Sequence, residues 1–202
     1  MGIADHLVEA AEAGDAFLVA RLLAEGAGVD TRNSVGRTAL DLAASRGHPE
    51  VVRLLITAGA DPEQRAGEHR ESTPLCLAAA HGRTAVVGAL IDAGVHLRAQ
   101  GRMRWVPLVL AATSGDRGHP QTVTLLLDRG ADIDAEMKSR TSLEWAARFG
   151  QVQMVRQLLG RGATPTTNVL AAAHEYAERH PESRQRNALM IDALRVASAA
   201  TD

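Results

Sequence analysis

The sequence has few of the residues that mark disulfide-linked or aromatic-rich folds. It contains one cysteine, Cys76, which excludes an intramolecular disulfide and fits a reducing compartment. Aromatic residues make up 2% of the chain, whereas leucine and alanine are abundant. Compact globular cores usually use aromatic side chains, but closely stacked short helices pack on alanine and leucine. The composition therefore favours an all-helical, thin and extended architecture.

Long apolar runs and a strong net charge are also absent. No stretch approaches the roughly 18 apolar residues that cross a bilayer, and the best candidate, residues 105–112, contains Pro107. The first residues lack the basic start and apolar run of a signal peptide, and His6 breaks the myristoylation pattern. The formal net charge of −2 gives no overall attraction to nucleic acid or an anionic membrane. We expect a cytoplasmic protein with no membrane partner and no nucleic-acid partner.

An internal repeat is the main feature that is present. Glycines follow apolar helical runs at spacings of 33, 35, 36 and 32 residues. Each run has apolar positions at i, i+1, i+4 and i+5, which make a broad stripe on one helical face. A glycine after the last turn is expected to be a left-handed helix cap. The runs span residues 18–23, 51–55, 86–91, 123–127 and 154–159, and the glycines are Gly26, Gly59, Gly94, Gly130 and Gly162.

A second, shorter helix is predicted before each of the last four runs, over residues 38–44, 73–79, 106–112 and 141–147. Three of these segments begin with threonine, a good N-cap residue. Pro74 follows its threonine at the first helical position, where the missing N–H costs nothing. A pair of alanines in each segment lets the two helices of a repeat approach closely.

Residues 33–65, NSVGRTALDLAASRGHPEVVRLLITAGADPEQR, resemble a nearly consensus ankyrin repeat. The resemblance covers roughly residues 5–164 and implies an all-α solenoid of helix pairs, with hairpin-like loops that project to one side of a concave groove. We expect a single domain over 1–202. Its repeats span about 3–32, 33–65, 66–100, 101–136 and 137–164, followed by a C-terminal helical cap over 165–202 with helices at about 168–180 and 184–199. In the cap, Leu189, Met190, Ala193, Leu194 and Ala197 form a stripe for docking on the fifth repeat.

The chain departs from the family pattern in two ways. The histidine of the usual Thr-Pro-Leu-His tetrapeptide is replaced by Asp41, Cys76, Val109 and Glu144. The fourth repeat also carries three extra residues, 115–117, between its two helices. Such insertions cost little stability because loop-closure entropy grows only logarithmically with length.

Motifs that carry catalysis or bind metals are not found. The sequence has no Gly-rich phosphate loop, no nucleophile elbow and no Cys-x-x-Cys pair. His174 and His180 are six residues apart on a predicted helix, so they lie on different faces and cannot share a metal ion. Cys76 lies between two leucines of a packing helix and is expected to be buried and inert. We predict no catalytic residue, no metal site and no cofactor, and we assign structural roles to His48 and His119.

The candidate binding residues come from the resemblance, because hairpin tips and the ends of first helices face the groove in ankyrin repeats. Many of the matching positions hold arginine or lysine, with a few apolar side chains among them, a combination typical of binding hot spots. The alternative is an ordinary solvated surface with Trp105 tucked under its neighbours. The residues are Arg37, Arg46, Arg70, His81, Met103, Arg104, Trp105, Lys138, Arg140, Arg148 and Phe149.

The sequence therefore predicts a protein–protein interaction module that binds an acidic, partly apolar protein or peptide segment in a basic groove. The alternative is an enzyme or a small-ligand or peptide-binding protein built on the same scaffold. In that case His81 or His69 would be the acid–base group, and Arg70, Arg104 or Arg148 would orient a carboxylate. No spacing in the sequence singles out such a constellation.

Overall fold

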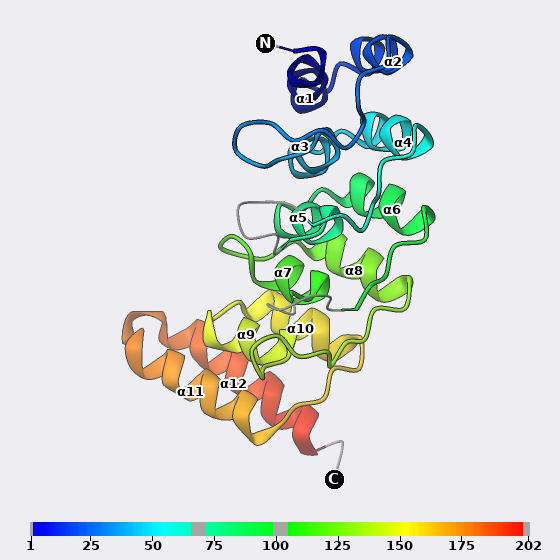
Figure 1. Cartoon of the computed structure of the whole chain (residues 1–202). Coiled ribbons are helices and arrows are strands. Elements are labelled where there is room, and N and C mark those ends of the chain that lie inside the picture. Colours follow the sequence, from blue (N-terminus) through cyan, green and yellow to red (C-terminus); the bar gives the residue numbers. More distant parts are fainter. Residues whose placement is uncertain (1, 66–71, 99–104, 200–202) are drawn as a thin grey trace. The chain divides into compact units, whose positions relative to one another are not determined.

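The computed structural model of the chain describes residues 2–65, 72–98 and 105–199. Two compact units make up the chain, Met1–Pro107 and Leu108–Asp202 (Figure 1). Apart from isolated bridge positions at Ser72 and Trp105, the regular structure of the described residues is helical, as predicted. Within these ranges, none of the helices combines the length and hydrophobicity that a membrane span requires.

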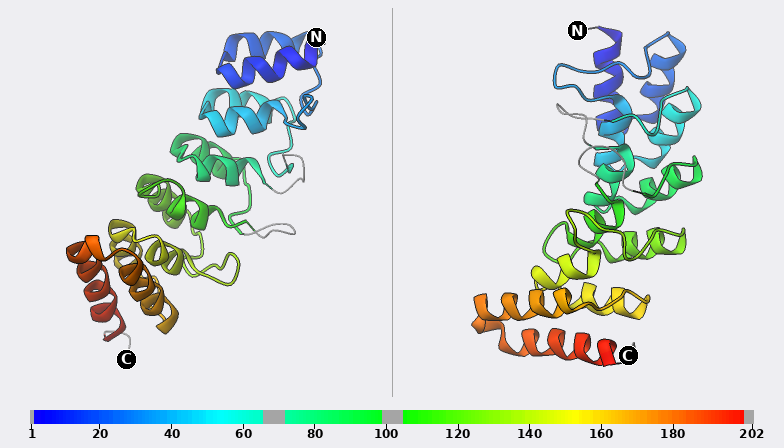
Figure 2. Two further views of the ribbon diagram at one scale, coloured as in Figure 1. Left: turned by 90° about the vertical axis from the view of Figure 1, so that its left-hand side faces the viewer. Right: turned by 60° about the horizontal axis from the view of Figure 1, so that its bottom comes forward.

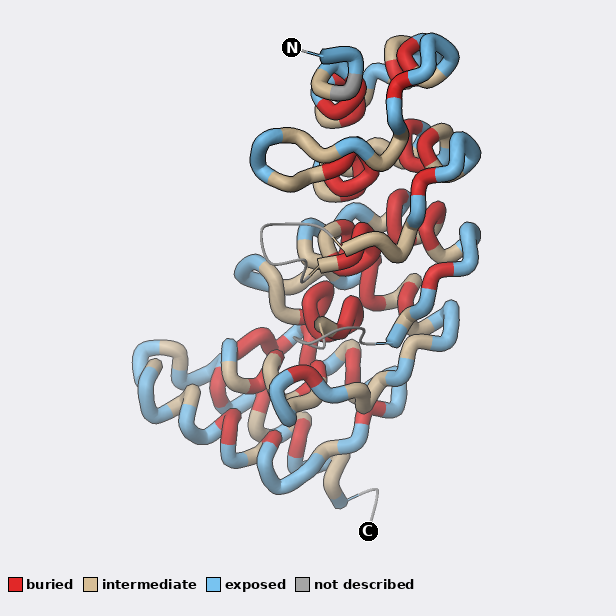
Figure 3. Tube along the Cα trace, in the orientation of Figure 1, coloured by how far each residue is buried: buried red, intermediate tan, exposed pale blue. Residues whose placement is uncertain are grey.

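The N-terminal unit consists of three helix pairs in two layers. The pairs are α1 (Ile3–Ala13) with α2 (Ala16–Ala24), α3 (Ala39–Arg46) with α4 (Pro49–Thr57), and α5 (Pro74–Ala80) with α6 (Thr84–Asp92). Helices α1, α3 and α5 pack on one another in order and form one layer, and α2, α4 and α6 form the other (Figure 1 and Figure 2). Figure 3 shows buried segments in both layers of helices. The fully buried residues include Leu40, Leu55, Leu75 and Leu90.

The C-terminal unit contains the remaining helices. These are α7 (Pro107–Thr113), which begins at the boundary, α8 (Pro120–Asp128), α9 (Ser142–Arg148), α10 (Val152–Gly160) and α11 (Thr167–Arg179), then a 3-10 turn at Pro181–Ser183 and α12 (Arg184–Ala199). Helix α11 packs on α9, and α12 packs on α10. Within this unit, the C-terminal pair therefore stacks on α9 and α10 as one more helix hairpin.

The C-terminal helical pair lies within a residue of its predicted bounds. Met190 and Leu194 of α12 are fully buried, as the predicted apolar stripe requires. The prediction is wrong for Leu189, whose side chain is 44% exposed. Leu189 lies about 100° around the helix from Met190, so it falls at the edge of the face that buries Asn187, Met190 and Leu194.

The threonine caps predicted for three first helices and the glycine caps predicted after the second helices are confirmed. The side chains of Thr38, Thr73 and Thr141 each accept a hydrogen bond from the backbone N–H three residues on. All the glycines that follow the second helices have φ between 85° and 97°, in the left-handed region. They are Gly26, Gly59, Gly94, Gly130 and Gly162.

Side chains at the turn between two helices tie the second, third and fifth repeats to the repeat before each of them. His48 Nε2 lies 3.0 Å from the carbonyl oxygen of Glu12, and Arg83 Nε donates to the carbonyl of Ser45 at 2.9 Å. In the C-terminal unit, Gln151 Nε2 donates to the carbonyl of Gly115 at 3.1 Å. The contact gives His48 the structural role that the sequence predicted.

Candidate functional site

The hairpin before α9 presents Lys138 to solvent. Met137 N–H donates to the carbonyl of Arg140 at 2.9 Å, and Arg140 N–H donates back at 3.3 Å. The two residues between them, Lys138 and Ser139, have φ of 53° and 58°. This is the geometry of a tight hairpin turn in which both central residues are left-handed, a conformation that glycine, asparagine and aspartate usually occupy. The flanking hydrogen bonds hold Lys138 and Ser139 in it.

Trp145 of α9 connects the hairpin to the helix that follows it. Its Nε1–H donates to the carbonyl of Met137 at 3.1 Å. The Arg140 guanidinium carbon lies 5.1 Å from the centre of the Trp145 ring, in cation–π range. Phe149, one turn later and 51% exposed, stacks on the same ring at 5.7 Å between centroids. Sequence reasoning missed Trp145, although its i, i+4 spacing to Phe149 was a usable signal.

Three of the predicted binding residues come together in one depression of the C-terminal unit. Lys138, Arg140 and Arg148 line a depression of about 340 Å³, and the exposed Ala171 of α11 contributes apolar surface to it beside the buried Ala172. Glu144 and Glu175 also line it. We call this the hairpin-side face: Lys138, Arg140, Glu144, Arg148 and Glu175.

The arginines of the hairpin-side face are already paired with carboxylates. Arg140 Nε lies 2.8 Å from Glu144 Oε1, and Arg148 Nη1 lies 2.9 Å from Glu175 Oε2. Lys138 forms no ion pair with the residues that the structure describes. The face is therefore less basic than the sequence indicated, because the two glutamates offset two of its three cations.

In the N-terminal unit, the same pairing occurs at Arg46. Its Nε donates to Glu12 Oε1 at 3.1 Å, between the ends of α3 and α1. Arg37 is partly buried, and its backbone N–H donates to Asn33 Oδ1 at 3.0 Å, which closes the hairpin before α3. Its Nε is buried and has no hydrogen-bond partner among the described residues.

The other predicted residues of this unit are less connected. His81 is exposed at the end of α5, and its Nδ1 lies 2.8 Å from the carbonyl of Leu77. Trp105 is partly buried, and its carbonyl lies 3.8 Å from Cys76 Sγ. Arg70, Met103 and Arg104 lie outside the described residues.

Asp41 fills the position where the family pattern has histidine. It is buried, its carboxylate accepts the Thr38 N–H at 2.9 Å, and its own N–H donates to Thr38 Oγ1 at 3.2 Å. Burial raises the pKa of Asp41 above its ordinary 3.8, while the Thr38 hydrogen bonds and the charges of Arg37 and Arg32 oppose the rise. Aspartate thus replaces an inter-repeat histidine with a reciprocal cap inside one helix.

Cys76 is buried, with 5% of its surface exposed. Burial also raises the pKa of its thiol above the usual 9.0, so the reactive thiolate is scarce at neutral pH. Both observations support the prediction that this cysteine is inert. Within the described ranges, no group of three or more His, Cys, Asp or Glu side chains is placed to hold a metal ion.

The family profile described as ankyrin repeats (three copies) matches this chain over residues 7–100, 58–137 and 99–169. The chain belongs to the ankyrin-repeat family, and this membership indicates a protein–protein interaction module.

Named relatives extend the comparison. The chain is 36% identical over 138 residues to the mouse B-cell lymphoma 3 protein homolog, a match to 67% of this chain and 30% of that protein. It is 34% identical over 185 residues to the ankyrin repeat and KH domain-containing protein mask-1 of Caenorhabditis elegans, covering 91% and 7%. It is also 31% identical over 160 residues to L-asparaginase of Dirofilaria immitis, covering 79% and 26%. The matches span less than a third of each relative, so what those whole proteins do is not carried over to this chain.

Proposed function

We propose that this chain binds an acidic, partly apolar segment of a partner protein on its hairpin-side face. The observation that carries the proposal is the convergence of Lys138, Arg140 and Arg148 on one depression whose lining includes two alanines. A partner carboxylate would bind Lys138 directly, and aliphatic atoms of the partner would cover Ala171.

Arg140 and Arg148 would bind the partner by exchanging their present carboxylate for one of the partner's. Arg140 is held over Trp145 and beside Glu144, so its guanidinium is already oriented before a partner arrives. A carboxylate of the partner competes with Glu144 and Glu175 for these two cations. The net gain from each arginine is therefore small, and the charges act mainly on association rate and salt dependence.

The proposal extends to the matching positions of the N-terminal unit, Arg37, Arg46, His81 and Trp105, and to Arg70, Met103 and Arg104. Trp105 would be the aromatic anchor for an apolar side chain of the partner. The alternative of an enzyme or small-ligand protein on this scaffold stays a prediction.

Selection from an unbiased displayed peptide library on the full chain tests the proposal. Selected peptides should be enriched in aspartate and glutamate, and a synthesised representative should bind on the order of tenfold more weakly to Lys138→Glu, or ~1.4 kcal/mol. The exposed Arg195 of α12 supplies the matched control, because Arg195→Glu makes the same charge change away from this face. The proposal would be refuted if the selected peptides were not enriched in aspartate and glutamate, or if Lys138→Glu and Arg195→Glu weakened peptide binding equally.

A further inference from the structure

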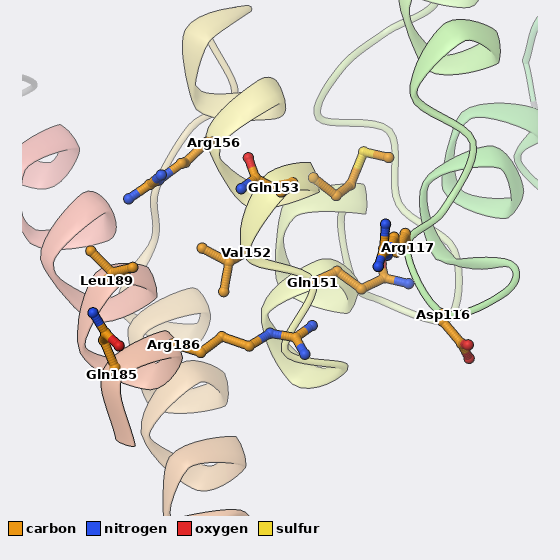
Figure 4. Close-up of a pocket in the computed structure, with 10 residues that line it drawn as sticks. Asp116, Arg117, Gln151, Val152, Gln153, Arg156, Gln185, Arg186 and Leu189 are labelled. Atoms are coloured by element: carbon orange, nitrogen blue, oxygen red, sulfur yellow. The ribbon is translucent and has the colours of Figure 1, made fainter. Parts of the chain in front are cut away.

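The C-terminal unit carries two adjoining depressions away from the hairpin residues, where the turns between paired helices meet α12. Their volumes are about 590 Å³ and 570 Å³, and both are lined by Asp116, Arg117, Gln151 and Arg186. Val152 and Leu189 add apolar surface to the larger one (Figure 4). We call these two depressions together the turn-side cleft: Arg117, Gln151, Val152, Arg186 and Leu189, with the other lining residues named as needed.

The three-residue insertion of the fourth repeat builds one wall of the turn-side cleft. Gly118, which follows it, has φ of 65°, and a Cβ there would lie 2.3 Å from the carbonyl oxygen of Ala112 and 2.7 Å from Met154 Cε. The loop is therefore closed tightly against α7 and α10. The Gln151 hydrogen bond to the carbonyl of Gly115 fixes its other end. This insertion thus places Asp116 and Arg117 at the cleft edge.

The C-terminal helices build the opposite wall. Arg186 Nη2 donates to the carbonyl of Gly150 at 2.7 Å, which sets its guanidinium beside the turn between α9 and α10. Tyr176 of α11 lies against the same glycine and lines the smaller depression together with the exposed Phe149. Leu189, the residue that fails to dock on the fifth repeat, contributes its exposed side chain to the larger depression.

The charge balance of the turn-side cleft differs from that of the hairpin-side face. Arg117, Arg156 and Arg186 line the larger depression, and none of them forms an ion pair with a described carboxylate. Asp116 is the one carboxylate among the described lining residues. The uncompensated positive charge of this unit is therefore greater here than where the sequence predicted it.

An unpaired acceptor gives a second, independent indication of a ligand. Gln151 is buried, with 3% of its surface exposed, and its Nε2 donates to the carbonyl of Gly115. Its Oε1 is shielded and has no hydrogen-bond partner among the described residues. An unsatisfied buried acceptor costs about 1–3 kcal/mol, which a bound N–H group would recover once the Gln151 side chain turns its Oε1 toward the cleft.

We propose that the turn-side cleft is a second binding site, separate from the hairpin-side face, and that it takes an acidic peptide segment with an aliphatic side chain. A carboxylate would lie between Arg117 and Arg186. A leucine-like side chain would cover Val152 and Leu189. A main-chain N–H of the peptide would donate to Gln151 Oε1 after that side chain turns toward the cleft. A simple inorganic anion would leave the apolar surface and the unpaired acceptor without a partner, so the peptide explains more of the site.

The test is a titration of the full chain, labelled with ¹⁵N, with the capped peptide acetyl-Glu-Leu-Glu-Leu-Glu-amide. Resonances of residues 115–118, 150–152 and 186–189, and the side-chain amide of Gln151, should shift with a Kd of about 1 mM or lower. Two control peptides separate the contributions: one with glutamine for every glutamate and one with serine for every leucine. Both should bind about tenfold more weakly, ~1.4 kcal/mol, and inorganic phosphate should bind more weakly still.

Variants separate this proposal from that of the hairpin-side face. Arg117→Glu and Leu189→Gln change exposed side chains and should each weaken the affinity measured from the cleft resonances about tenfold, whereas Lys138→Glu and Arg195→Glu should leave that affinity unchanged. The proposal is overturned if phosphate matches the peptide, if shifts are confined to residues 138–148, or if no shift occurs. Loss of acidic-peptide binding in Lys138→Glu alone would overturn it while supporting the other face.

Discussion

Replacing Gly150 by alanine should be far more damaging than replacing Gly162, although both are left-handed glycines of the C-terminal unit. Gly150 has φ of 62°, and Gly162 has φ of 87°. A Cβ added at Gly162 would have nothing within 4 Å, but one at Gly150 would lie 2.1 Å from Cζ of Tyr176. The pair therefore separates the backbone cost of a left-handed residue from the steric cost of lost packing space.

The magnitudes follow from these two surroundings. At Gly162 the left-handed conformation costs an L-residue about 1–2 kcal/mol, and the reduced entropy of the unfolded chain returns about 0.4–1 kcal/mol. The net loss should be about 1 kcal/mol. At Gly150 the same backbone cost applies, and pushing the Tyr176 ring aside adds about 1–3 kcal/mol of overpacking. The total should be about 2–4 kcal/mol.

Urea unfolding followed by far-ultraviolet circular dichroism measures both losses, with the slope m compared between variants to check that the same transition is observed. Combining Gly150→Ala with Tyr176→Ala should give a smaller loss than the sum of the two single variants, because the clash disappears with the ring. If Gly150→Ala costs no more than Gly162→Ala, Tyr176 does not lie over Gly150 and the stacking of α11 on α9 is wrong.

Two further predictions concern buried groups of the N-terminal unit. Cys76 should react slowly with a thiol reagent in the native protein and fully after denaturation, because its thiol is buried and its pKa is raised; fast native labelling would contradict this. Asp41→Asn keeps an oxygen that can accept the Thr38 N–H but cannot ionise. Burial raises the pKa of Asp41 above 3.8, so wild-type stability from this group is present at low pH and lost as pH rises through the folded-state pKa. As pH rises through that pKa, the variant should therefore gain stability relative to wild type, and it should keep the gain at higher pH. Urea midpoints measured from about pH 4 to pH 8 should show this gain, and a stability difference that does not change with pH would rule it out.

The helices could be predicted because their signals are local. Thr38 as a cap and Gly59 as a stop each act within one turn of the helix that they bound, so reading the sequence located them to within a residue or two. The spacing of Glu144 four residues after Arg140 was equally local. Arg140 precedes the cap Thr141, so the helical i, i+4 rule does not identify this ion pair, and the sequence reasoning counted only the basic partner.

The charge of the candidate site could not be read in the same way. Arg148 pairs with Glu175, which lies 27 residues later on a helix of the next pair. Which carboxylate meets which arginine depends on the rotation of α11 about its axis, and no local pattern specifies that rotation. The turn-side cleft was hidden for the same reason, because it needs the insertion near Arg117 and the N-terminal end of α12 in one place.

The ties between neighbouring repeats have a consequence for how the chain is made. Each side-chain hydrogen bond described between successive helix pairs joins residues 27 to 38 positions apart, with Arg148 to Glu175 the shortest span and Arg83 to Ser45 the longest. A helix pair leaving the ribosome therefore finds its docking surface in the segment synthesised just before it. At about 5–20 residues per second, the two residues of each bond are synthesised within a few seconds of each other. None of these bonds requires the whole chain. Assembly can then proceed from one helix pair to the next as synthesis continues, with the apolar face of only the newest pair exposed at any moment.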